Sequence, residues 1–241
     1  MCFLLIGSDR LSDLALSQSL STLAAQAGLS GGSKAPDHVN VARRPGVAAI
    51  RAAALVNARH AAHTSNVDAN AIHDEMEHAR LTFHRILELA TDADLAKPSN
   101  GTRWTNKQLL FHMLLGYLVV HALLRLVHVF GRLPAGASAA YARLLNMVTK
   151  PFDAANYLGS WFGGSLLSSD RMMTMFDRVV VNLHRRLEAE SKDNLARGMH
   201  YPTRWDPFFK YFMTLGDIYH FPTQHFDFHH GQLSIDEQRR G

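Results

Sequence analysis

Apolar residues recur at steps of three and four from residue 68 onward, which is the period of an amphipathic helix. The first such stretch begins near Asp68, carries Ile72, Met76 and Phe83, and stops before Lys97. Another begins at about residue 170, and its apolar stripe is Met173, Phe176, Val180, Leu183 and Leu187. Strand patterns are nearly absent. The chain is therefore predicted to be all-α, with helices that pack by their apolar faces.

The helix expected over residues 105–130 has an explicit start. Thr105 can cap it, Gln108 can reach back to complete a capping box, and Trp104 can pack against Leu109. This helix is apolar and nearly long enough to span a bilayer. It also contains four side chains that are costly at bilayer depth, His112, His121, Arg125 and His128. We therefore expect a buried helix of a bundle and no membrane span.

The last helix is expected to begin at Trp205-Asp206-Pro207 and to end near Gly231. In this interpretation Asp206 is the N-cap and Pro207 occupies the first helical position. Pro222 lies inside the helix and removes one backbone hydrogen bond, so a kink is expected just before His225.

The connection over residues 131–169 is long, and it is predicted to hold two short helical pieces at about 139–147 and 153–161. A connection of that size lets the helix after it run parallel to the helix before it. The other two connections are shorter and suit antiparallel neighbours. The prediction is a four-helix bundle of up-down-down-up topology, with a long crossover between its second and third helices.

Residues 1–67 differ in composition from the rest of the chain. They are rich in Ala, Ser and Gly, and they are predicted to form a low-complexity, disordered N-terminal extension. Their opening apolar run is too short for a secretory signal peptide, and four arginines (Arg43, Arg44, Arg51 and Arg59) leave a transit peptide as a minority alternative. The folded domain is predicted over 68–235, with a tail over 236–241 and a cytoplasmic location.

Charge and cysteine usage exclude several classes of function. The net charge is +4, and the lysines and arginines are scattered along the chain, which argues against a nucleic-acid partner. The only cysteine is Cys2, so the chain has no intrachain disulfide and no cysteine-based zinc site. Any thiol in the chemistry must therefore arrive as a substrate.

A His-x-x-x-His pair, His225 and His229, lies in the last predicted helix. The two side chains are about 40° apart around an α-helix, so one metal ion can take both imidazoles, whereas His230 lies about 140° from His225. Zinc peptidases of the HExxH type need Glu after the first histidine, and here that position is Phe226. Peptidase chemistry is therefore disfavoured, and packing without metal remains an alternative for the isolated pair.

The predicted topology suggests a third ligand. His112 comes early in its helix and His225 late in the last one, so antiparallel helices would bring them level. His121 falls on the opposite face from His112, and His128 shares the face of His121. Those two are interpreted as core or interface histidines.

Two motifs together resemble one family. Trp104-Thr-x-x-Gln-Leu-Leu-x-His112, followed by His225-x-x-x-His229-x-Gly-Gln-Leu233, is similar to the DinB/YfiT-like superfamily of four-helix metalloproteins. The resemblance covers about residues 68–233 and implies that His112, His225 and His229 are metal ligands. The chain departs from the family pattern at Gln108, where a carboxylate is frequent, and at His230, where a basic residue is usual.

The resemblance also implies a chemistry. Relatives with assigned activities include transferases and isomerases that use a low-molecular-weight thiol such as bacillithiol or mycothiol. Three neutral imidazoles leave a divalent ion its full charge and suit zinc or nickel, with iron or copper as alternatives. Such an ion acidifies a thiol or water that binds it. Gln232, seven residues after His225, is a candidate to orient a ligand histidine.

Three hypotheses follow from these observations. The first is a metal-dependent transferase, in which the bound thiol attacks an electrophilic small molecule. The second is a metal-dependent hydrolase with the same ligands and water as the nucleophile. The third is a non-catalytic binding or dimerisation module with structural histidines. A homodimer is expected from the apolar helix at 105–130.

Overall fold

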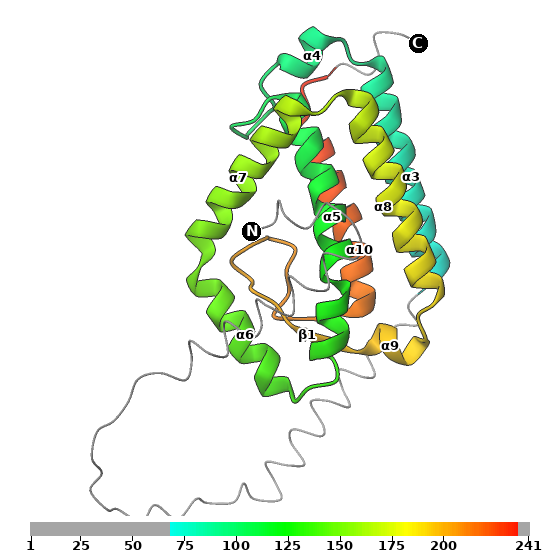
Figure 1. Cartoon of the computed structure of the whole chain (residues 1–241), viewed down its shortest axis with the longest axis vertical. Helices are drawn as coiled ribbons and strands as arrows, with labels where there is room; N and C mark the ends of the chain where they lie inside the picture. The colour runs from blue at the N-terminus through cyan, green and yellow to red at the C-terminus, as the bar shows by residue number, and fades with distance from the viewer. Residues whose placement is uncertain (1–67, 236–241) are drawn as a thin grey trace, which may run out of the picture. The chain divides into compact units, whose positions relative to one another are not determined.

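The computed structural model describes residues 68–235, and these residues are mostly helical (Figure 1). The all-α class predicted from the sequence is confirmed. The only strands among the described residues are two of three residues each, which the sequence did not predict. The predicted extension over 1–67 and the tail over 236–241 lie outside the described residues.

Four long helices surround the core: α3 (Ala69–Leu89), α5 (Asn106–Phe130), α8 (Ser169–Glu188) and α10 (Leu215–His230). Both α3 and α5 pack against α8 and α10, which closes a ring of four helices. Aromatic side chains fill its centre, where Phe176 stacks on Phe83 and meets Tyr117 edge-on. In Figure 1, α5 and α10 run in opposite directions, so the start of one lies near the end of the other.

The predicted start of α5 is confirmed, because both hydrogen bonds of the predicted capping box are present. Thr105 accepts from the backbone N–H of Gln108, and the Gln108 side chain accepts from the N–H of Thr105. The first helix is shorter than predicted because it ends at Leu89. A second capping box, built by Thr91 and Asp94, starts the separate helix α4 (Asp92–Ala96).

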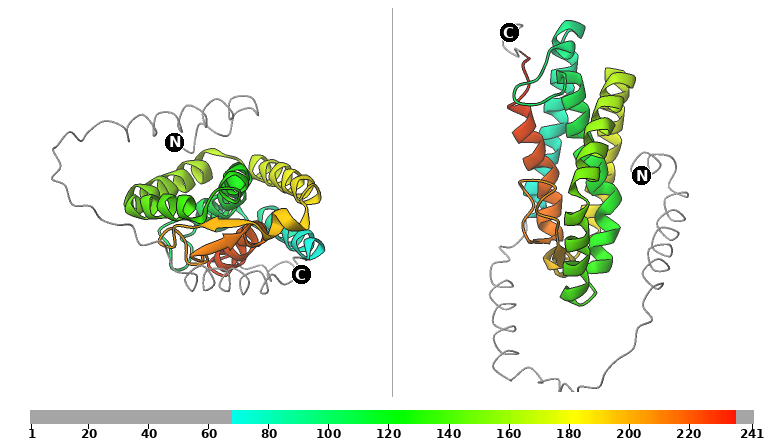
Figure 2. Two further views of the ribbon diagram at one scale, coloured as in Figure 1. Left: turned by 90° about the horizontal axis from the view of Figure 1, so that it is seen from below. Right: turned by 90° about the vertical axis from the view of Figure 1, so that its left-hand side faces the viewer.

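The long connection holds two full helices, α6 (Ala135–Met147) and α7 (Thr149–Leu166), and both are longer than predicted. Helix α7 packs along α5 (Figures 1 and 2). The two backbones approach closely, since a Cβ atom at Gly164 would lie 2.5 Å from Cα of Gln108. Only glycine fits such a crossing.

The predicted start of the last helix is wrong. After α9 (Lys192–Ala196), the strands β1 (Gly198–His200) and β2 (Phe212–Thr214) pair in antiparallel register, and α10 begins only at Leu215. A capping box between Thr214 and Asp217 sets this start. Asp206 caps no helix, because its Oδ1 accepts from the N–H of Phe208 at 2.8 Å in a loop.

Trp205 anchors that loop to the connection. Its ring stacks on Phe152 of α7 with centroids 3.9 Å apart, and its Nε1 donates to the carbonyl of Leu145 at 3.0 Å. The residues expected to open a helix therefore hold a loop against α6 and α7.

Helix α5 is also the one described helix that is long and apolar enough, by length and composition alone, to cross a membrane. Its buried residues, among them Leu110, Leu114 and Val120, belong to the core shared with the other helices. A core helix of this kind passes the same test, so the finding is weak evidence for a span.

Candidate metal centre

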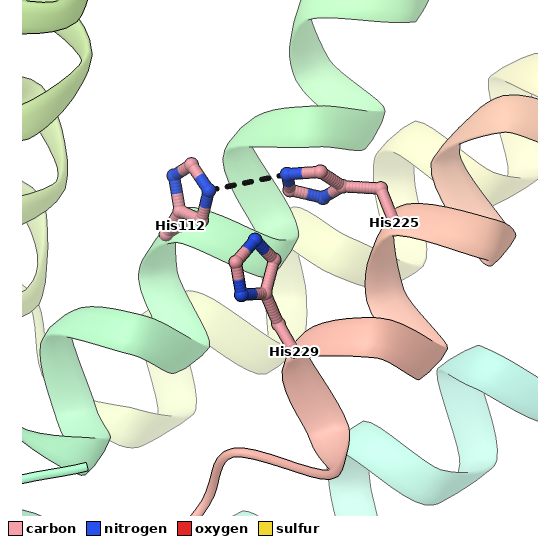
Figure 3. Close-up of side chains that lie close together, drawn as sticks. All are labelled: His112, His225 and His229. Atoms are coloured by element: carbon pink, nitrogen blue, oxygen red, sulfur yellow. Dashed lines mark hydrogen bonds between the residues drawn. The ribbon is translucent and has the colours of Figure 1, made fainter. Parts of the chain in front are cut away.

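Three histidines meet between α5 and α10. His112 comes from α5, and His225 and His229 come from successive turns of α10 (Figure 3). One ring nitrogen from each lies within 4.8 Å of the other two, and this is the only such group of three or more metal-ligating side chains in residues 68–235. His112 and His225 are buried, and His229 is partly buried.

The spacing of His112 and His225 is that of two ligands on one ion. Their Nε2 atoms lie 3.1 Å apart. Two nitrogens bound to a tetrahedral zinc ion at about 2.1 Å are separated by about 3.4 Å. An ion thus fits between them with a small adjustment, and the donor set is chemically suited to a divalent metal.

Helix α7 orients the ring of His112. Nδ1 of His112 lies 3.1 Å from Oγ of Ser160, and that hydroxyl lies 2.9 Å from the carbonyl oxygen of Asn156. A hydroxyl carries one hydrogen, and the carbonyl can only accept it. Ser160 therefore accepts from Nδ1–H of His112, which leaves Nε2 unprotonated and available as a ligand.

His229 is oriented in the same way. Its Nδ1 lies 2.7 Å from Oε1 of Gln232, and an amide oxygen can only accept. Nδ1 therefore carries the proton, and Nε2 is free to bind metal. The sequence suggested Gln232 from its spacing to His225, and the structure places it after the end of α10, against His229. Metal-binding histidines commonly donate their second N–H to such an acceptor.

His225 has a different environment. Its Nδ1 is buried without a hydrogen-bond partner, and it faces Gly116 of α5. A Cβ atom at Gly116 would lie 3.1 Å from that nitrogen, so glycine makes room for the ring. On its other side, Nε2 of His225 lies 3.8 Å from Oδ2 of Asp206, which brings one carboxylate beside the centre.

The three histidines are held in their neutral form. Burial, and then the neighbouring His229, lowers the pKa of His112 to about 3. Burial and the two other histidines hold the pKa of His225 well below its usual range. Burial also lowers the pKa of His229, although the hydrogen bond to Gln232 acts in the opposite direction. Neutral imidazole is the form that binds metals.

Aromatic rings cover His112. Trp104 stacks on it with centroids 4.6 Å apart, and the indole Nε1 donates to the carbonyl of Tyr157 at 3.4 Å. The Tyr157 ring lies beyond Trp104, with the guanidinium carbon of Arg103 4.5 Å from its centroid. From the sequence, Trp104 was predicted to pack on Leu109, and its stacking on His112 was not predicted.

Five other described histidines have polar partners away from this group. His128 pairs with Glu190 at 2.7 Å. His84 contacts Asp177, and His220 contacts Glu75. His73 and His184 contact each other through their Nδ1 atoms.

Ser160, Gly116 and Asp206 were not identified from the sequence. Ser160 and Gly116 carry no motif, and Asp206 was assigned to a helix cap.

The family model of the DinB superfamily matches residues 75–233, which is more than half of the chain and includes all three histidines. No curated protein and no solved structure gives a significant match.

Proposed function

This chain belongs to the DinB superfamily, and we propose that it is a metal-dependent transferase. In this proposal His112, His225 and His229 hold a divalent ion, and a low-molecular-weight thiol attacks an electrophilic small molecule there. The observation that carries the proposal is the fixed tautomer of two of the histidines. Ser160 and Gln232 accept hydrogen bonds from Nδ1–H of His112 and His229, which leaves both Nε2 atoms unprotonated and available as ligands.

The ligand set supports an ion with open positions. Three neutral imidazoles leave a bound divalent ion its full charge. Imidazole nitrogens suit zinc and nickel, and iron or copper is compatible. Such an ion supplies Lewis-acid activation by lowering the pKa of a thiol or water that reaches it. The chain itself orients the ligands, and Trp104 shields one face of His112 from water.

The thiol has to come from outside the folded domain. The only cysteine of the chain is Cys2, so residues 68–235 contain no thiol nucleophile. The family resemblance favours a cosubstrate of the bacillithiol or mycothiol type. The partners proposed are therefore a small thiol and a small electrophile, with no nucleic acid and no membrane, in the cytoplasm. We also interpret the ring of α3, α5, α8 and α10 as the up-down-down-up bundle expected from the sequence.

One observation favours hydrolysis as a second candidate. Oδ2 of Asp206 lies 3.8 Å from Nε2 of His225. Burial raises the pKa of Asp206, against the opposing hydrogen bond from Phe208. A carboxylate with a raised pKa beside the centre can accept a proton from an attacking water.

The proposal is tested by offering the zinc-loaded, untagged protein a panel of electrophiles with and without thiol. Loss of the electrophile and formation of the thioether are followed by mass spectrometry. The transferase predicts turnover only with thiol, abolished in His112→Ala and kept in His128→Ala. Turnover without thiol that Asp206→Asn abolishes would favour the hydrolase. No turnover under either condition would favour a binding module.

A further inference from the structure

Helix α7 exposes four large apolar side chains and buries four small residues. Trp161 is 41% exposed, Phe162 43%, Leu158 49% and Leu166 74%. The residues of the same helix that are buried are Gly159, Ser160, Gly163 and Gly164. A surface helix ordinarily has the opposite distribution.

The inner face of α7 cannot accept large side chains. A Cβ atom at Gly163 would lie 2.1 Å from the ring of Phe111, and one at Gly164 would lie 2.5 Å from Cα of Gln108. The outer face is turned away from α5, since α7 lies at the edge of the domain (Figures 1 and 2). Core packing therefore does not account for the large apolar residues on that outer face.

Further exposed apolar residues lie at the end of α6 and just after it, namely Leu144, Met147 and Val148. On α7 the exposed residues Leu158, Trp161, Phe162 and Leu166 are spaced so that they share one face of the helix. We call these seven residues the α6–α7 stripe. For side chains of ordinary size, the exposed fractions amount to roughly 800 Å², about the area that each partner of a standard interface buries. The largest apolar patch of a typical monomer is about 300–600 Å².

Charge is absent from the α7 part of the stripe. No Asp, Glu, Lys, Arg or His occurs between Asp153 and Asp170. When two copies of one surface meet about a two-fold axis, each charge near the axis faces its own copy. A face without charges avoids this repulsion, and the depletion of charge is typical of the centre of protein interfaces.

We propose that the α6–α7 stripe is the surface by which this chain binds a second copy of itself, with the two α7 helices packed antiparallel at the centre of the interface and the α6 residues toward its edge. The spacing on α7 fits a two-fold axis close to Phe162. Leu158 lies four residues before it and Leu166 four residues after it, so Leu158 of one copy meets Leu166 of the other. Trp161 and Phe162 supply the aromatic centre of the interface.

This surface differs from the one that the sequence suggested. A homodimer was expected from the apolar residues of α5, but nine large apolar side chains of that helix are buried in the core. The dimer proposed here uses α6 and α7, and it leaves α5 inside each copy.

The experiment measures the mass of the full chain by sedimentation equilibrium through the micromolar range. The wild type is expected at twice 26.9 kDa. Leu166→Glu and Trp161→Glu are expected at 26.9 kDa with unchanged circular dichroism, because each places two like charges in the interface. Leu81→Glu on α3 is the matched control, since Leu81 is 54% exposed, and it is expected to stay dimeric.

A cross-link tests whether a second copy of the chain covers the α6–α7 stripe. In a Cys2→Ser background, Phe162→Cys lies near the proposed axis and is expected to form an intermolecular disulfide under mild oxidation, whereas Leu81→Cys is not. A monomeric wild type would overturn the proposal, as would a dimer that survives Leu166→Glu. A monomer that floats with phosphatidylcholine vesicles would also overturn it, in favour of a lipid surface.

Discussion

The hydroxyl oxygen of Ser160 lies 3.1 Å from Nδ1 of His112, so α7 and α5 meet in a hydrogen bond at the histidine group. Because Ser160 gives its only hydrogen to the carbonyl of Asn156, it accepts from the imidazole. One tautomer of His112 satisfies this arrangement. An outer helix of the domain thereby sets the position of a proton on a proposed metal ligand.

Removing that acceptor should weaken metal binding. In Ser160→Ala the Nδ1–H of His112 loses its partner, and the ring is no longer held in one tautomer. Zinc affinity is expected to fall about 10- to 100-fold, measured by competition with a chelating dye. Ser165→Ala on the same helix loses only its contact with Gln108 and should keep wild-type affinity. Equal affinities in the two variants would show that Ser160 does not orient His112.

Gln232 should act on His229 in the same way. Gln232→Met removes the acceptor that lies 2.7 Å from Nδ1 and is expected to lower zinc affinity by a similar factor. Gln232→Glu keeps an acceptor oxygen at that position and should retain the affinity. Gln224→Met, at an exposed position of α10, is the control. If the Met and Glu variants bind zinc equally, the hydrogen bond is irrelevant to the site.

The parts of the fold that the sequence predicts well are those with strong local signals. The capping box of Thr105 and Gln108 marks the start of α5, and the apolar stripe around Phe176 marks α8. The three histidines combine two motifs that lie 113 residues apart, and the helix directions bring them together.

The sequence fails where tertiary contacts decide the structure. Asp206-Pro207 is a good local start for a helix, but Trp205 binds α6 and α7, and the pairing of β1 with β2 delays α10 to Leu215. Helix α7 was underestimated because its glycines weaken the helical pattern, and their use in the close contact with α5 is visible only in three dimensions. Ser160 was missed for the same reason.

The crossing of α5 and α7 should tolerate no added methyl group. Gly164→Ala would place a Cβ atom 2.5 Å from the backbone of Gln108, so a shift of one helix is required. The free energy of unfolding is expected to fall by about 1–3 kcal/mol, measured with urea. Gly136→Ala in α6 meets nothing within 4 Å and should change stability by less than about 0.5 kcal/mol. Similar losses of unfolding free energy in Gly164→Ala and Gly136→Ala would contradict the close approach of α5 and α7 at Gly164.

Acid should destabilise the metal-free protein. The pKa of His112 is lowered to about 3 in the folded state, and that of His225 is also lowered, so the unfolded chain takes up protons first as the pH falls. The stability from keeping these groups neutral is present above about pH 6.5 and declines below it. The slope is up to about 1.4 kcal/mol per pH unit for each histidine.

Urea unfolding of the metal-free protein at a series of pH values measures this slope. His112→Phe keeps a ring beneath Trp104 and removes one titrating group, so its slope should be smaller. A stability that stays constant from neutral pH to about pH 4 would contradict the burial of neutral histidines.

His112, His225 and His229 should bind one divalent ion. The metal content of untagged protein, measured by plasma mass spectrometry, shows whether they do, and the protein is untagged because a histidine tag would bind metal itself. The wild type and His128→Ala should carry about one ion per chain, and His225→Ala should carry almost none. Folded wild-type protein that is free of metal and cannot be loaded would contradict the claim, and so would a His225→Ala variant that holds as much metal as the wild type.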